Sequence, residues 1–64
     1  MSDRALEVLA IQLREKREYL TDSLADVSAK DYAEYRAICG EIRGLLIAET
    51  YVKDLAKNLE DSDE

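Results

Sequence analysis

Apolar residues recur at spacings of three, four or seven along most of this chain, and that spacing is the feature that most limits its fold. One set is Leu6, Leu9, Leu13, Leu20, Leu24 and Val27; the second is Tyr35, Ile38, Ile42, Leu45, Val52 and Leu59. This spacing places side chains on one face of an α-helix, whereas a half-buried strand requires strict alternation. The sequence also contains no proline, the strongest helix breaker. We therefore expect two long helices.

A capping pattern separates the two apolar sets. Ser28 followed by Asp31 fits the arrangement in which a serine side chain accepts a hydrogen bond from an early backbone N–H of a helix. Val27 and Tyr32 are placed to form the hydrophobic staple around that cap. We predict helices over about residues 3–26 and 29–59, joined by a tight corner. A short connection makes the helices antiparallel, so the predicted fold is an all-α, two-helix hairpin over residues 1–59.

The net charge of −6 is concentrated at the C-terminal end of the chain. Residues 60–64 carry four carboxylates and no base, which leaves 11 acidic and 9 basic residues in the rest of the sequence. A nearly neutral body argues against general affinity for nucleic acid, which requires clustered Lys and Arg. We expect residues 60–64 to form a solvated acidic tail.

The second helix carries more apolar surface than one neighbouring helix can cover. Leu45, Leu46, Ile47 and Ala48 are consecutive and point in four directions around a helix. A helix that is hydrophobic all round is normally buried all round. We therefore expect the hairpin to assemble into a helical bundle or ring, as a homo-oligomer or within a larger protein assembly. The expected interface residues are Ile38, Gly40, Ile42, Gly44, Leu45, Leu46 and Ile47.

Two glycines and a run of charges are unusual for long helices. Gly40 and Gly44 continue a stripe of small residues, and such spacing indicates close approach of another helix or of a bulky side chain. Residues 14–18 are all charged and span the first helix all the way round, so at least one of them must face the other helix. Because Arg17 lies roughly opposite Gly40 in an antiparallel hairpin, we predict an ion pair between Arg17 and Glu41, within or between chains.

The residues that usually carry catalysis or bind metal are sparse. Cys39 lies in the middle of a helix and the chain has no histidine, so a Cys-His nucleophile and an ordinary zinc site are excluded within one chain. The acidic row Glu15, Glu18, Asp22 and Asp26 is typical of a solvated helix face. We predict no catalytic residue, no metal site and no cofactor.

One segment resembles a known class of proteins. Residues 35–45, Tyr-Arg-Ala-Ile-Cys-Gly-Glu-Ile-Arg-Gly-Leu, together with Asp54-Leu55, are similar to small helical proteins encoded by tailed bacteriophages. The resemblance implies a role in the virion, around the head or its portal, or an accessory role early in infection. It also implies a soluble protein located in the cytoplasm of the bacterial host or in the virion, in keeping with the absence of a long apolar run.

The first functional hypothesis is therefore a non-catalytic structural or interaction protein that oligomerises and forms a minor part of a phage particle. An alternative is a small acidic regulator or inhibitor that binds a basic site on a host protein. A second alternative is a nucleic-acid-binding hairpin dimer, whose layout is similar to the RNA-binding hairpin of plasmid copy-number control. That function requires Arg14, Lys16, Arg17, Arg36 and Arg43 to line one face. The sequence leaves stoichiometry, partner and stage of action open.

Overall fold

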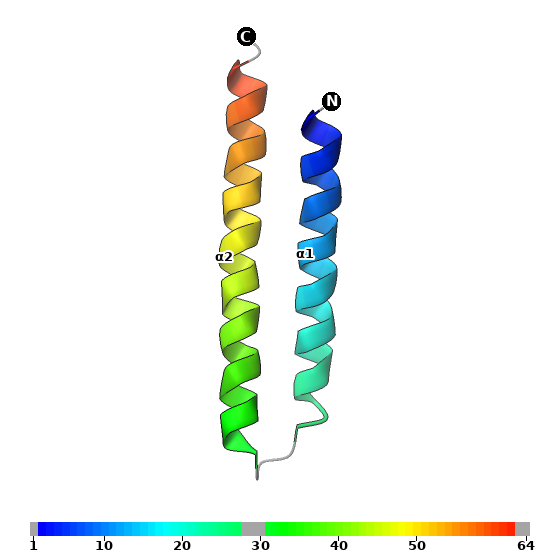
Figure 1. Ribbon diagram of the computed structural model, residues 1–64, viewed down its shortest axis with the longest axis vertical. Helices are drawn as coiled ribbons and strands as arrows, with labels where there is room; N and C mark the ends of the chain where they lie inside the picture. Colours follow the sequence, from blue (N-terminus) through cyan, green and yellow to red (C-terminus); the bar gives the residue numbers. More distant parts are fainter. Residues whose placement is uncertain (1, 28–30, 63–64) are drawn as a thin grey trace.

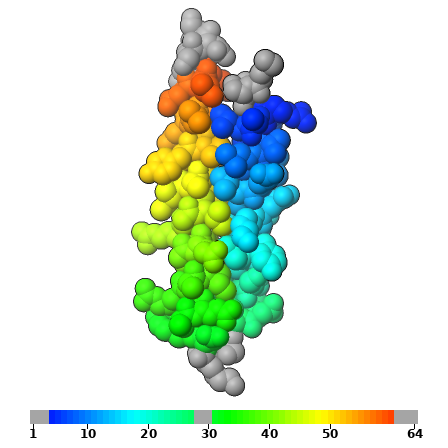
Figure 2. Space-filling model, viewed as in Figure 1, coloured from blue at the N-terminus to red at the C-terminus, as the bar shows by residue number. Residues whose placement is uncertain are grey.

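The computed structural model describes residues 2–27 and 31–62, which form two antiparallel helices packed side by side. Helix α1 spans Ser2–Leu24 and helix α2 spans Tyr32–Ser62. Both chain ends lie at the same end of the hairpin, and α2 extends past the start of α1 (Figure 1). The space-filling view shows a narrow rod in which the two helices touch along their length (Figure 2). The predicted all-α two-helix hairpin is confirmed.

One stripe of each helix faces the other helix, and we call the two stripes together the seam. From the first helix and the residues that follow it, the seam contains Leu6, Ala10, Leu13, Arg17, Leu20, Leu24 and Val27. From α2 it contains Ile38, Ile42, Leu45, Glu49, Val52, Ala56 and Leu59. Spacings of four and three alternate without a break in both sets, which is the seven-residue repeat of helices that pack along their length. Leu20, with 7% of its surface exposed, is the one buried hydrophobic residue among those described.

Two residues of the predicted apolar stripes lie outside the seam. Leu9 is 40% exposed and Tyr35 is 44% exposed, whereas the smaller Ala10 is half-buried. The seven-residue repeat explains why Ala10 is more buried than Leu9. Leu6 and Leu13 face α2, and the seam position between them is residue 10. Size and hydrophobicity alone favour Leu9 over Ala10 as the residue that faces α2.

Helix α1 ends in tighter turns. Thr21 Oγ1 donates to the carbonyl of Arg17 at 2.9 Å, and Ser23 Oγ donates to the carbonyl of Tyr19 at 2.9 Å. Hydroxyl groups that bond back in this way compete with the backbone and weaken a helix slightly. The backbone N–H groups of residues 25, 26 and 27 then bond three residues back, at 3.2, 3.0 and 3.3 Å. These bonds satisfy carbonyls at the end of α1, which finishes at Leu24 and not near residue 26 as predicted.

Helix α2 is capped by Asp31. The Asp31 carboxylate accepts a hydrogen bond from the backbone N–H of Glu34 at 3.4 Å, and the Asp31 carbonyl accepts the bond from Tyr35 N at 3.0 Å. The predicted start near residue 29 and the predicted cap Ser28 lie outside the described residues. The cap that the structure shows is a second pattern in the same segment, Asp31-x-x-Glu34, which resembles the capping box. A hydrogen bond and the like charge of Asp31 raise the pKa of Glu34.

At its other end α2 continues to Ser62, so the first residues of the expected acidic tail belong to the helix. Residues 63 and 64 of that tail lie outside the described part of the chain. The boundary predicted at residue 59 coincides with the last residue of the apolar stripe. The helical backbone continues three residues beyond that point, to Ser62.

Replacement of the cap should destabilise α2. We expect Asp31→Ala to lower the free energy of unfolding by about 1 kcal/mol, because an early backbone N–H loses its acceptor. Thermal unfolding followed by circular dichroism at one fixed chain concentration measures the change. Asp26→Ala, which removes another exposed carboxylate near the connection, is the matched control and should change stability much less. Equal effects of the two substitutions would show that Asp31 does not cap α2.

Candidate protein-protein interface

A charged pair lies within the otherwise apolar seam. Arg17 Nε donates to Glu49 Oε2 at 2.6 Å, and Arg17 Nη2 donates to Glu49 Oε1 at 3.2 Å. The two side chains are only 25% and 12% exposed, so both are held between the helices. Two parallel N–H to oxygen bonds fix the orientation of both groups, which a single contact does not. The hydrogen bond from Arg17 lowers the pKa of Glu49, and the same bond raises the pKa of Arg17.

The predicted pairing of Arg17 with Glu41 is wrong within the chain. Glu41 is exposed, and Arg17 reaches a glutamate two turns further along α2. Side chains on a helix lean toward its N-terminal end, and in this hairpin that direction points toward the C-terminal half of α2. The expectation that one of the five consecutive charges faces the other helix is confirmed, because Arg17 alone among residues 14–18 is half-buried.

Sequence reasoning missed Glu49, although the sequence contains a signal for it. The apolar stripe of the first helix skips from Leu13 to Leu20, and that of the second skips from Leu45 to Val52. In a seven-residue repeat, a gap of seven between two apolar residues contains one further seam position, four residues after the first of them. In the first helix that position is Arg17, and in the second it is Glu49. Two matching gaps filled by opposite charges therefore predict this pair.

The two glycines do not face α1. Both are exposed, and a Cβ atom built on either would meet no heavy atom within 4 Å. Within the described part of the chain, the close approach expected at these glycines does not occur. Each glycine destabilises an exposed helix by about 1 kcal/mol relative to alanine, and packing within the hairpin does not compensate for it.

The seven expected interface residues divide into two groups. Ile38, Ile42 and Leu45 are half-buried and belong to the seam within the chain. Gly40, Gly44, Leu46 and Ile47 are exposed. The second group remains available to a partner.

Large apolar side chains are exposed around both helices, well beyond the expected interface set. Their exposed fractions range from 40% to 70%, and the residues are Val8, Leu9, Ile11, Tyr19, Tyr32, Tyr35, Leu46, Ile47, Tyr51 and Leu55. Single exposed hydrophobic residues are normal on a soluble protein, but ten are many for a chain of 64 residues.

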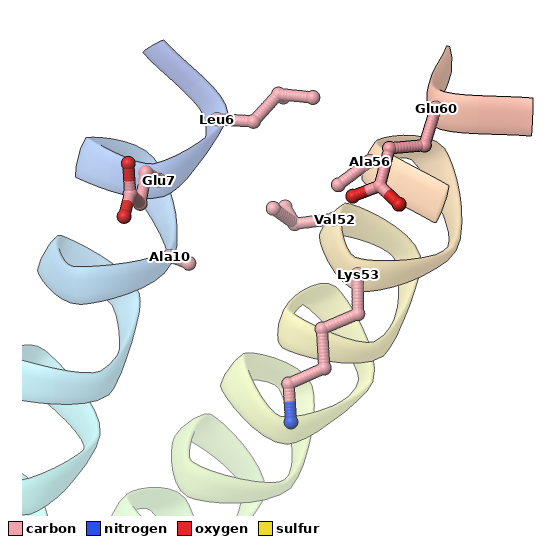
Figure 3. A pocket seen from close by; sticks show the side chains of 7 residues that line it. All are labelled: Leu6, Glu7, Ala10, Val52, Lys53, Ala56 and Glu60. Carbon is pink, nitrogen blue, oxygen red and sulfur yellow. The ribbon is translucent and has the colours of Figure 1, made fainter. Parts of the chain in front are cut away.

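A groove opens along the seam near the chain ends. Its lining comes from both helices (Figure 3) and consists of Leu6, Glu7, Ala10, Val52, Lys53, Ala56 and Glu60. The close-up shows Leu6 and Val52 extending into the space between the helices, whereas Ala10 and Ala56 are too short to fill it. The two alanines at seam positions therefore leave space between the helices here.

Other chemically reactive groups do not gather into a site among the described residues. Cys39 is a free, half-buried thiol on α2. Within the described ranges, no three side chains of the types that bind metal come together. Because Arg17 is turned into the seam and paired, it cannot contribute to the basic face that the nucleic-acid hypothesis requires within one chain.

Comparisons with protein-family models, curated proteins and solved structures find no match for this chain. Neither of the two described helices has the length and apolar character needed to cross a membrane.

The ion pair can be tested by exchanging its charges. We expect Arg17→Glu to lower the melting temperature clearly, because it places two carboxylates in the seam, and we expect Arg17→Glu with Glu49→Arg to recover most of the loss. Glu41→Arg is the matched charge reversal on the exposed surface and should not rescue Arg17→Glu. Rescue by Glu41→Arg in place of Glu49→Arg would overturn the observed pairing.

The pair should also make stability depend on pH. The folded chain holds the pKa of Glu49 below its ordinary value, so the stabilisation is complete above about pH 4.3, the usual pKa of glutamate, and is lost as pH falls through the lowered value. We expect the stability difference between the wild-type chain and Glu49→Gln to shrink as pH is lowered from 7 to 2. Urea unfolding at several pH values measures it, and a difference that does not change with pH would contradict the prediction.

Proposed function

We propose that this chain is a non-catalytic interaction protein that works by packing its exposed helix faces against other helices, first of all those of further copies of itself. The observation that supports the proposal is the near absence of a core. Among the described residues only Leu20 is a buried hydrophobic residue, while ten large apolar side chains are at least 40% exposed.

The accessible surface area of the chain supports the same proposal. A compact monomer of 7.3 kDa exposes about 4,200 Å², whereas this hairpin exposes 5250 Å². The same chain unfolded would expose about 10,600 Å², so folding as a hairpin removes about half of that surface where a domain of this size normally removes about 60%. Association with other helices would supply the missing burial.

The elongated shape explains why the hairpin cannot supply that burial by itself. The Cα trace measures 54 × 15 × 10 Å, so almost every residue lies within one side-chain length of the surface. Two helices share one seam, and each presents most of its circumference to the surroundings. An additional helix placed along the hairpin would cover apolar residues without disturbing the seam.

The proposal concerns how the chain works. That it forms part of a phage particle remains a prediction from the resemblance of residues 35–45. The exposed apolar residues favour a partner that offers apolar helix faces over one that offers a basic site, so the interaction hypothesis is preferred to the acidic regulator.

Dilution tests the proposal directly. If association completes the core, helicity should fall as the chain is diluted, because ordering each backbone residue opposes folding by about 1–2 kcal/mol and the isolated hairpin buries little apolar surface to offset it. Circular dichroism across a hundredfold range of concentration measures helicity, and sedimentation equilibrium measures mass over the same range. A monomer that remains fully helical at every concentration would overturn the proposal.

A further inference from the structure

The exposed side of α2 combines small and large residues in an ordered way. At about 100° per residue, nine positions of α2 fall within an arc about 80° wide, roughly a third of a turn away from the seam, and the last two of them are Asn58 and Ser62. We call the first seven positions the small–large face, and they are Ala33, Ala37, Gly40, Gly44, Ile47, Tyr51 and Leu55. All seven are exposed. The four small residues occupy its first half and the three large ones its second half.

We propose that the small–large face binds the same face of a second copy of this chain, with the two α2 helices antiparallel and related by a two-fold axis near Leu45 and Leu46. This inference rests on the proposed function and specifies its partner and geometry. A two-fold interface must be self-complementary, because the same patch serves both partners. An antiparallel arrangement makes the small–large face self-complementary, because the small half of each helix meets the large half of the other.

The sizes of the residues match pair by pair. About an axis between residues 45 and 46, Gly44 lies level with Ile47 of the second copy and Gly40 lies level with Tyr51 of the second copy. Ala37 lies within one residue of the level of Leu55. The open space beside both glycines would accept these large side chains, since a Cβ at either position meets nothing within 4 Å. Tyr51 and Ile47, at 70% and 48% exposed, would be covered in return.

The charges beside the face match as well. Arg36 and Asp54 lie on the same edge of the face, both exposed, at positions that differ by 18 residues. In an antiparallel pair, the same edges of the two helices lie against each other. Arg36 then lies within one residue of the level of Asp54 of the second copy, and the symmetry produces this opposite-charge pair twice. A parallel pair in register would instead leave Arg36 about 27 Å along the axis from Asp54 of the second copy, too far apart for this ion pair.

Disulfide trapping tests the geometry. All variants carry Cys39→Ala, and chains with Gly40→Cys are mixed with chains with Tyr51→Cys under mild oxidation. We expect a disulfide between the two kinds of chain and little within either kind, because like positions would lie about 16 Å apart along the axis, beyond the reach of a disulfide. Thr50→Cys in place of Tyr51→Cys is the matched control, since it lies at the same level but points away from the face. Efficient Gly40→Cys self-linkage would overturn the antiparallel arrangement.

Charge exchange provides an independent measurement in the uncrosslinked protein. Arg36→Asp should raise the dissociation constant of the dimer by roughly tenfold, because two exposed ion pairs become two repulsive contacts. Asp54→Arg alone should act similarly, and the two substitutions together should restore association. Lack of rescue, with the double variant still helical by circular dichroism, would contradict the proposed register.

Sedimentation of the same samples separates the two levels of the proposal. If the wild-type chain is monomeric at the concentrations used for trapping, the proposed function fails. If it associates but shows neither the Gly40–Tyr51 disulfide nor charge rescue, self-association stands and the small–large face is not the interface.

Discussion

Two helices that pack side by side share a single seam, and the rest of this structure depends on that constraint. Each helix contributes one stripe at alternating spacings of three and four, and these stripes contain nearly all the side chains that are even partly covered. Everything outside the seam is left to solvent or to a partner. The exposed isoleucines, leucines and tyrosines follow from the number of helices, because no other arrangement of a two-helix hairpin hides a second stripe.

Within the seam, apolar packing is interrupted by alanines at residues 10 and 56 and by the Arg17–Glu49 pair. The alanines leave a groove near the chain ends, and the charged pair replaces hydrophobic contact with two directed hydrogen bonds. Removal of charge from water opposes the attraction between the two groups, so such a pair contributes more to geometry than to stability. The seam therefore fixes the alignment of the two helices but contributes little to their stability. This is consistent with a chain whose stability depends on association.

The fold could be predicted from the sequence because the apolar spacing and the missing proline both favour helices. The details that prediction missed share a physical cause, which is that several residues satisfied the same local pattern. Asp31 resembles a cap as well as Ser28, which lies outside the described residues, and sequence reasoning missed that the Asp31 carboxylate accepts a hydrogen bond from the backbone N–H of Glu34. Leu9 is larger than Ala10 but lies off the repeat. Glu41 is exposed and lies off the seven-residue repeat, whereas Glu49 occupies a seam position and pairs with Arg17.

The candidate interface was predictable only in part. The sequence shows that the second helix is apolar on several sides, but it cannot show which side α1 covers. The structure assigns Ile38, Ile42 and Leu45 to the seam and leaves Gly40, Gly44, Leu46 and Ile47 exposed. Once one side is assigned, the grouping of small residues in the first half and large residues in the second half of the remaining surface becomes interpretable.

The bidentate pair between Arg17 and Glu49 has a consequence for how the two helices can slide. A seven-residue repeat is nearly indifferent to slippage by one repeat, since apolar residues would again meet apolar residues. Here such a slip would place Arg17 opposite Ile42 or Ala56. Arg17 and Glu49 would then both lose their hydrogen-bond partner in the seam. The Arg17–Glu49 pair thus favours the observed alignment over one shifted by a repeat, and this alignment fixes the position of every α2 surface along the length of α1.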